Sequence, residues 1–242
     1  MRAPTAYELL AVWERCAART PAERAVELLA LASPDAPGDE LAALTVGKRD
    51  ELLLDLRERA FGSRLAAGGR CAACGEPVEF TLEADELYVA EPERPTELSL
   101  SVDGYELRFR LATGADLAAV SRALDAEVAR SRLLARCVLE ARRDGAEVPV
   151  ATLPRAVVEA LAGRMAAADP QADVELGLSC PACGHAWKAS FDPASFLWSE
   201  LDAWTRQTLH DVHTLATAYG WTESEVLALG ARRHVYLELA GA

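Results

Sequence analysis

The chain has 242 residues, 51% of them hydrophobic, which is enough for one large or two modest domains with a buried core. Its 38 acidic and 25 basic residues give a formal net charge of -13, which argues against a broad phosphate-binding face and disfavours nucleic acid as a partner. No apolar run approaches the roughly 20 residues that span a bilayer, and the N-terminus lacks a signal-peptide pattern. We therefore expect a cytoplasmic protein with no membrane partner.

The N-terminal segment predicts three helices. Apolar residues recur every three to four positions in residues 9–13 and again in residues 26–31. The dipeptide Thr20-Pro21 separates these runs and should start the second helix, because Thr caps helix N-termini and Pro fits the first turn. Composition predicts a loop over residues 33–39, and periodicity predicts a third helix over about residues 46–61.

The middle of the chain changes to a period of two. Apolar and polar residues alternate over residues 98–111 on either side of Asp103-Gly104, which predicts a β-hairpin with a two-residue turn. A long helix is expected next, from about residue 116 to 143, where Asp144-Gly145 would stop it. A shorter helix is expected over about residues 154–168, opened by its proline.

The C-terminal fifty residues also predict helices. The first runs over about residues 194–219, and Gly220 is its expected C-terminal cap. Thr222 and Glu225 have the spacing of a capping box for a short helix, and a last helix includes residues 235–239. We expect this helical segment to pack on the N-terminal helices.

Four of the six cysteines fall in two matching pairs. These are Cys71-Ala-Ala-Cys74 and Cys180-Pro-Ala-Cys183, each followed by glycine. Two residues between the cysteines let both thiolates reach one tetrahedral ion, and the glycine turns the backbone so that its N–H groups point at the sulfurs. The pairs therefore predict one structural zinc ion with four cysteine ligands.

Apolar alternation surrounds the pairs as in a zinc ribbon. It follows the first pair over residues 78–82 and the second over residues 187–191, and it precedes the second over residues 174–178. The two halves of the ribbon are separated by 105 residues. Four cysteines would close the coordination sphere, so the site should fold protein rather than catalyse a reaction.

Other interpretations of the cysteines stay open. Each pair can be a redox dithiol or two unrelated thiols, although neither pair has the βαβ setting of a thioredoxin-type site. His185, next to Cys183, can replace one cysteine ligand. Cys16 and Cys137 lie on apolar helical faces and are expected to be buried and inert.

No other cluster carries clear chemistry. His210 and His213 have a spacing that could share a metal ion, but a polar helix face explains them as well. Arg108 and Arg110 are expected on the solvated face of the hairpin. Since no nucleophile-base set, phosphate cradle or general acid-base pair occurs, we interpret the chain as a non-enzyme.

Together these elements predict an α+β fold that is mostly helical, with a four-cysteine zinc ribbon split by a long insertion containing a β-hairpin and two helices. The expected segments are an N-terminal helical segment (1–66), the first half of the ribbon (67–92), the insertion (93–170), the second half of the ribbon (171–192) and a C-terminal helical segment (193–242).

Five stretches carry a resemblance to a known family, namely residues 44–62, 71–80, 105–116, 218–229 and 232–239. Together they resemble the baseplate proteins of T4-like contractile phages and their relatives in phage-tail-like contractile injection systems. The cysteine pairs are closer to the injection-system branch. The resemblance implies a non-enzymatic baseplate or baseplate-assembly protein, or an assembly chaperone, whose partners are other baseplate, hub or spike proteins.

Two other classes of function compete with this one. A zinc-ribbon protein that binds nucleic acid or a transcription complex is the main alternative, although such ribbons usually bring a basic patch and only scattered arginines occur around residues 57–70 and 129–143. A metal-dependent enzyme that uses His210 and His213 would need a second metal ion per chain.

Overall fold

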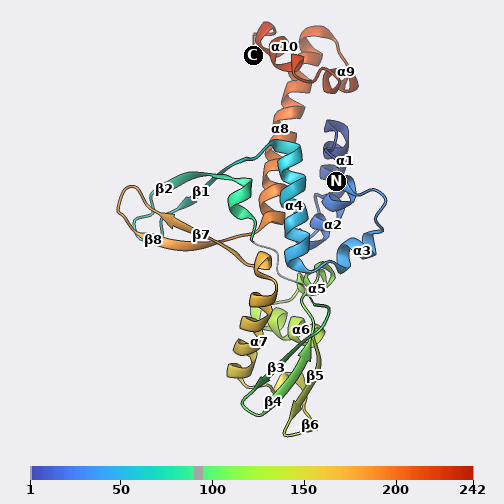
Figure 1. Ribbon diagram of the computed structural model, residues 1–242. Coiled ribbons are helices and arrows are strands. Elements are labelled where there is room, and N and C mark those ends of the chain that lie inside the picture. The colour runs from blue at the N-terminus through green and yellow to red at the C-terminus, as the bar shows by residue number, and fades with distance from the viewer. Residues whose placement is uncertain (1, 90–94, 242) are drawn as a thin grey trace.

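The computed structural model describes residues 2–89 and 95–241 (Figure 1). Helices predominate, and the strands of this part of the chain form three separate antiparallel sheets of two, four and two strands. The predicted α+β class with a helical majority is confirmed. Within the described ranges no helix is both long and apolar enough to cross a membrane.

Four helices form the body of the molecule. They are α1 (Ala6–Cys16), α2 (Pro21–Ala32), α4 (Val46–Phe61) and the first half of α8 (Pro193–Tyr219). The three predicted N-terminal helices are confirmed, and Thr20 caps α2 by accepting a hydrogen bond from the Glu23 N–H. The loop expected over residues 33–39 ends early, because Gly38 starts the short helix α3 (Gly38–Ala43), which buries Leu41.

The apolar faces of these helices meet in one core, which confirms that the first part of the C-terminal segment, up to residue 204, packs on the N-terminal helices. Its most buried members are Val12, Cys16, Ala25, Leu28, Leu29, Leu53, Leu56, Leu197 and Leu201. Trp13 Nε1 donates to Asp202 Oδ1 at 2.8 Å, and the Arg24 guanidinium lies 4.1 Å from the ring centre of Trp198. Each buried leucine stabilises the body by about 1.5–3 kcal/mol.

Arg57 joins this body to the start of the first half of the ribbon. Its side chain is 3% exposed, and its guanidinium donates to both carboxylate oxygens of Glu200 at 2.7 Å each. The same group donates to the carbonyls of Gly62 at 2.6 Å and Arg64 at 2.7 Å, where α4 ends and the first strand begins. A planar group with five N–H donors suits this position, because carbonyls at a helix end lack partners within the helix.

Two β-hairpins project from one side of the body (Figure 1). The first consists of β1 (Arg64–Arg70) and β2 (Pro77–Glu83), followed by the 3-10 turn η1 (Ala84–Leu87), and the second of β7 (Val174–Ser179) and β8 (Ala186–Phe191). Three of these strands follow the predicted alternation. The sequence pattern does not predict β1, because its Leu-Ala-Ala-Gly-Gly stretch has no period-two alternation.

The residues between the two β-hairpins form a separate unit at one end of the body (Figure 1). Its sheet has the order β3 (Leu98–Val102), β4 (Tyr105–Phe109), β5 (Val138–Arg143) and β6 (Ala146–Glu147). Its helices are α5 (Gly114–Val120), α6 (Ala126–Cys137) and α7 (Arg155–Ala168), with 3-10 turns η2 (Val150–Thr152) and η3 (Pro170–Ala172). Phe109 and Leu161, both fully buried, lie in the core between the sheet and α7.

The predicted hairpin is confirmed, whereas the predicted helix over residues 116–143 is wrong. Asp103-Gly104 turns with positive φ angles of 51° and 76°, and Asp144-Gly145 does the same with 50° and 82°. Asp144-Gly145 therefore ends a strand, β5, and not a helix. Asp125 separates α5 from α6 by capping α6. The described part of the insertion, residues 95–170, accordingly contains four strands and three helices instead of one hairpin and two helices.

Asp116 is the polar centre of this unit. Its carboxylate is fully buried and accepts hydrogen bonds from Arg110 at 2.5 and 3.0 Å, from Arg136 at 2.7 Å, and from the N–H and hydroxyl of Thr113 at 3.0 and 2.9 Å. Arg110 is therefore only partly solvated, with 30% of its side chain exposed and its guanidinium paired with Asp116, while Arg108 is half exposed as predicted. Burial opposes ionisation of Asp116, but these donors outweigh it and hold its pKa well below the ordinary value.

Close backbone contacts join this unit to α4. The Gly47 N–H donates to Asp169 Oδ2 at 2.9 Å, and the Val46 N–H donates to the Ala112 carbonyl at 2.9 Å. The Gln171 side chain bridges the two connecting segments, accepting from the Val89 N–H and donating to the Leu87 carbonyl. Hydrogen bonds therefore fix the unit to the start of α4 and tie its two connecting segments to each other.

Gly47→Ala is expected to destabilise the chain by about 2 kcal/mol, because an added Cβ would lie 2.0 Å from Asp169 Oδ1 and would break the contact at this joint. Gly163→Ala is the matched control. A Cβ at that position of α7 meets nothing within 4 Å, and alanine should stabilise the helix by up to about 1 kcal/mol. Chemical unfolding of both variants measures the difference, and equal effects would contradict the close approach.

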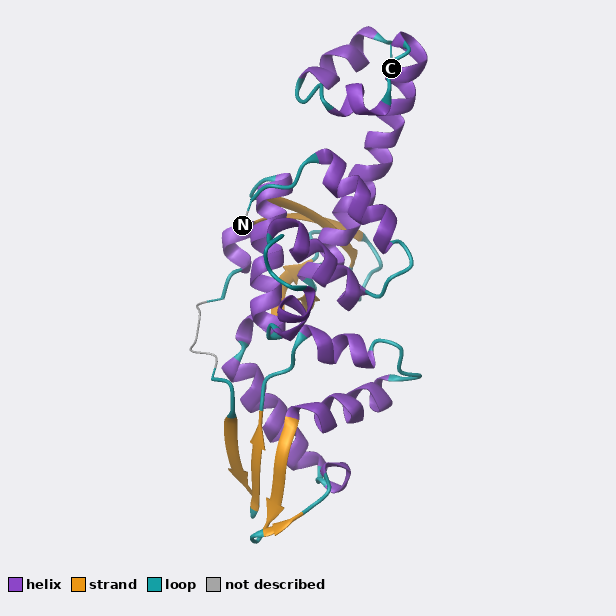
Figure 2. Cartoon of the chain, turned by 90° about the vertical axis from the view of Figure 1, so that its right-hand side faces the viewer, coloured by secondary structure: helices purple, strands orange, loops and turns teal. Residues whose placement is uncertain are grey.

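The second half of α8 extends beyond the body and carries two short helices at its far end (Figure 2). These are α9 (Glu223–Leu227) and α10 (Arg232–Leu239). Gly220 ends α8 in the left-handed conformation, with a φ of 70°, as predicted. The predicted capping box of Thr222 and Glu225 is also confirmed.

Candidate metal centre

The two cysteine pairs fold into matching knuckles at the tips of the hairpins. In the first, the Gly75 N–H donates to the Cys71 carbonyl at 2.9 Å, and the Cys71 N–H donates to the Glu76 carbonyl at 2.9 Å. The second knuckle repeats both bonds with the same distances, from Gly184 to Cys180 and from Cys180 to His185. Each glycine has a positive φ, 75° and 73°, which glycine adopts at no steric cost.

The four sulfur atoms converge on one point. All four Sγ atoms lie within 4.8 Å of one another. Across the two knuckles, Cys71 Sγ lies 3.7 Å from Cys183 Sγ, and Cys74 Sγ lies 3.7 Å from Cys180 Sγ. A tetrahedral zinc ion with four sulfurs at about 2.3 Å would place the sulfurs about 3.8 Å apart. The donor set therefore fits one tetrahedral ion.

The ionisation of the sulfurs also favours a cation. The Cys74 N–H, with other donors of the knuckle, lowers the pKa of the Cys71 thiol to about 6. The Glu76 N–H acts in the same direction on Cys74, but the adjacent sulfurs, that of Cys183 foremost, outweigh it and raise the pKa of Cys74 to about 12. One thiolate forms readily, whereas further thiolates need a positive charge to offset their repulsion.

Apolar contacts hold the hairpins against each other at both ends. Val78 and Trp187 pack beside Cys71 and Cys180 at the tips. A second cluster lies where the hairpins leave the body, and its members are Leu54, Leu65, Leu82, Ala84, Leu87, Val174, Leu176, Phe191 and Phe196. The sulfurs thus lie at the end of two hairpins that already face each other. An ion bound there would join segments that are far apart in the sequence.

The remaining cysteines and histidines lie elsewhere. Cys16 and Cys137 are buried in helices, as expected, with 0% and 1% exposure. His185 is exposed and stacks on Trp187 with ring centres 6.0 Å apart. His210 and His213 are exposed on α8. Among the described residues, the one group of three or more potential ligands close enough to share an ion consists of the four cysteines.

This arrangement defines a class of protein, a helical α+β scaffold with a closed four-sulfur centre on two hairpins. Four sulfur ligands complete a tetrahedral sphere, so such a centre stabilises structure and does not activate water. The chain belongs to the family described as T4 bacteriophage base plate protein, whose model matches residues 23–198. The match begins in α2, includes both cysteine pairs and ends in α8. No curated protein and no solved structure matches the chain.

Proposed function

We propose that Cys71, Cys74, Cys180 and Cys183 bind one structural Zn2+ as thiolates. The sulfur-only donor set and the spacing of the sulfurs support zinc, because soft thiolates in a tetrahedral arrangement suit this ion. The ion fastens the two knuckles and so keeps the hairpins in one orientation. Its role is structural, since the four sulfurs leave no position for a substrate.

We propose further that the chain is a non-enzymatic baseplate component or assembly chaperone of a contractile tail or phage-tail-like injection system. The observation that carries this function is the match of the base plate family to most of the chain, residues 23–198. The cysteine pairs support the injection-system branch. The protein acts through contacts with other baseplate, hub or spike proteins.

The far end of α8 is the part of the surface best suited to such a contact. It lies outside the residues that the family model matches and extends away from the body (Figure 2). Tyr219, Val235 and Leu239 are 40%, 52% and 70% exposed there. The rings of Tyr219, Trp221 and Tyr236 pack with centres 4.7 to 6.0 Å apart, so α10 is held firmly against α8. Ordered, exposed aromatic and aliphatic side chains are favoured at protein interfaces.

Deleting residues 222–242 is therefore expected to block the assembly of sheathed particles. The deletion removes α9 and α10 and leaves the body, the ribbons and the sheet unit intact. Electron microscopy of particles from the native host measures assembly, and sedimentation of the purified variant checks that it is folded. Normal particles from the deletion mutant would contradict the proposed contact, as would a folded variant that still copurifies with baseplate proteins.

A further inference from the structure

β3 is the outer strand of the four-stranded sheet, and its far edge has no partner strand among the described residues (Figure 2). Along an antiparallel pair of strands, residue pairs that are hydrogen-bonded to each other alternate with pairs that are not. The residue pair that flanks a two-residue turn is hydrogen-bonded. Counted from the closing pair of Val102 and Tyr105, the N–H and C=O groups of Ser99 and Ser101 point away from β4. They form a row of free donors and acceptors.

The sequence of β3 offers no protection against pairing at this edge. Natural edge strands are usually protected by charged residues, proline or a bulge. β3 reads Leu-Ser-Leu-Ser-Val and contains none of these, whereas every other strand in the described part of the chain carries a charged residue. An uncharged, regular edge of this kind is suited to accept another strand.

β3 is complementary to itself. In an antiparallel pair of two β3 strands centred on Leu100, Leu98 lies opposite Val102, and Ser99 lies opposite Ser101 of the other copy. Apolar residues then meet apolar residues on one face, and serines meet serines on the other. The register also uses the free backbone groups. Ser99 of each copy and Ser101 of the other copy form the pairs whose N–H and C=O groups are hydrogen-bonded to each other. No like charges lie opposite each other within the five paired residues.

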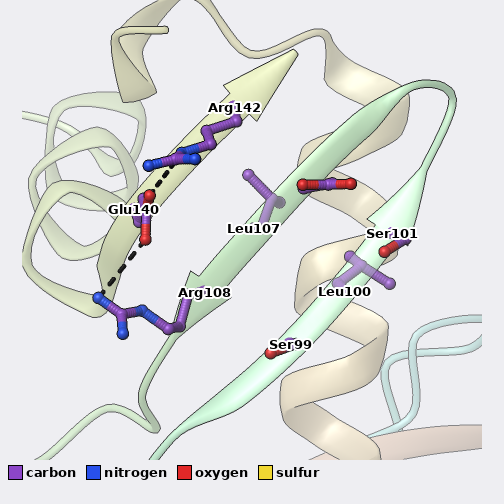
Figure 3. A pocket seen from close by; sticks show the side chains of 8 residues that line it. Ser99, Leu100, Ser101, Leu107, Arg108, Glu140 and Arg142 are labelled. Carbon is purple, nitrogen blue, oxygen red and sulfur yellow. Dashed lines mark ion pairs between the residues drawn. The ribbon is translucent and has the colours of Figure 1, made fainter. Parts of the chain in front are cut away.

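The outer face of β3 is open, and its inner face is only partly covered. On the outer face, β3 presents only serine side chains beside Arg108 and Glu106 of β4, next to a hollow of about 380 Å³ (Figure 3). Glu140 pairs with Arg108 at 3.5 Å and with Arg142 at 2.6 Å in this hollow, and Arg108 also pairs at 3.7 Å with Glu97, which directly precedes β3. On the inner face, Leu100 and Val102 are half-buried, and a second β3 would cover them.

We propose that two copies of this chain pair through their β3 strands and form a continuous eight-stranded antiparallel sheet with Leu100 on the two-fold axis. A symmetric dimer needs a self-complementary patch, and β3 provides one in both backbone and side chains. The contact is short, so the dimer is weak and concentration-dependent. This inference depends on neither the metal site nor the baseplate role.

The test uses the full-length protein and charged pairs in place of the two serines. Wild-type protein should show dimer formation in sedimentation equilibrium at concentrations up to about 100 μM. S99K/S101K and S99E/S101E each place two like-charged pairs across the axis and should weaken self-association by about tenfold or more. Mixing the two variants places Lys opposite Glu at both positions and should restore dimers that contain one chain of each.

A matched control adds two lysines to other exposed strand positions. T81K/S190K changes β2 and β8 in the same way and should leave self-association unchanged. Circular dichroism of each variant checks that it is folded. A monomeric wild-type chain over the whole concentration range would overturn the proposal. Undiminished dimers of the like-charged variants, or the absence of mixed dimers, would overturn it as well.

Discussion

Cys74→Ser and Cys183→Ser are each expected to abolish stoichiometric zinc binding and to unfold the paired hairpins. Structural zinc sites have apparent binding free energies of about 10–16 kcal/mol, which is comparable to or larger than the usual net stability of about 5–15 kcal/mol for a whole domain. Each variant removes one of four sulfurs, and the knuckles then lose the contact between Cys74 and Cys180 or between Cys71 and Cys183. Limited proteolysis with elemental analysis measures both effects.

Ala182→Ser is the control for these variants. It adds a hydroxyl group at an exposed position of the second knuckle, beside Cys183, and removes no sulfur. Its zinc content and protease resistance should equal those of the wild-type protein. A Cys74→Ser protein that keeps one zinc ion and intact hairpins would show that the four sulfurs are not the ligand set. A strong zinc chelator should reproduce the cysteine variants in the wild-type chain.

Asp116→Asn is expected to destabilise the chain by about 3 kcal/mol near neutral pH, the lower end of the range for breaking a buried ion pair. The variant removes a fully buried charge that joins Arg110, Arg136 and the start of α5. The lower end applies because both arginines are partly exposed, at 30% and 43%, and can be solvated once their partner is neutral. Chemical unfolding at pH 7 measures the loss.

The stability that Asp116 provides should depend on pH in a defined direction. Its pKa in the folded chain lies well below the ordinary value of about 4, so its contribution is complete above about pH 5 and is lost progressively as the pH falls from about 4 toward the folded pKa. The difference between wild type and Asp116→Asn should therefore shrink on acidification. Glu127→Gln, at an exposed position of α6, should change stability by less than about 0.5 kcal/mol. A difference independent of pH would contradict the pairing.

Strong local signals made the cysteine centre and many of the elements predictable. Each cysteine pair and its glycine define a knuckle within five residues, so the chemistry needs no long-range information. The capping residues Thr20 and Thr222 and the turn at Asp103 are equally local. The pairing of the two knuckles followed from ligand count, because two sulfurs do not complete a zinc site.

Elements that depend on tertiary pairing were not predictable in the same way. Residues 138–143 pair with β4, which lies about thirty residues earlier in the sequence, and their pattern alone continues that of the preceding helix. β1 is a strand because it pairs with β2, although it contains two glycines. The sequence predicts a solvated Arg110 because nothing local indicates that its partner Asp116 is buried.

Rigidity would connect the proposed metal centre to the proposed assembly role. The hairpins, the sheet unit and the far end of α8 all project from one helical body (Figure 1). Hydrogen bonds of Arg57 and Gly47 fix the bases of the first two projections, and the proposed ion at the four sulfurs would fasten the hairpin tips. Surfaces held in fixed relative positions lose little conformational freedom when they bind, which favours assembly with several neighbours at once.

Zinc K-edge X-ray absorption of the wild-type protein, purified without added metal, tests the central claim most directly. We expect one zinc ion per chain with four sulfur neighbours at about 2.3 Å and no nitrogen neighbour. This result would assign the ligands as Cys71, Cys74, Cys180 and Cys183. A protein without stoichiometric zinc, or a zinc ion with a mixed nitrogen and sulfur shell, would contradict it.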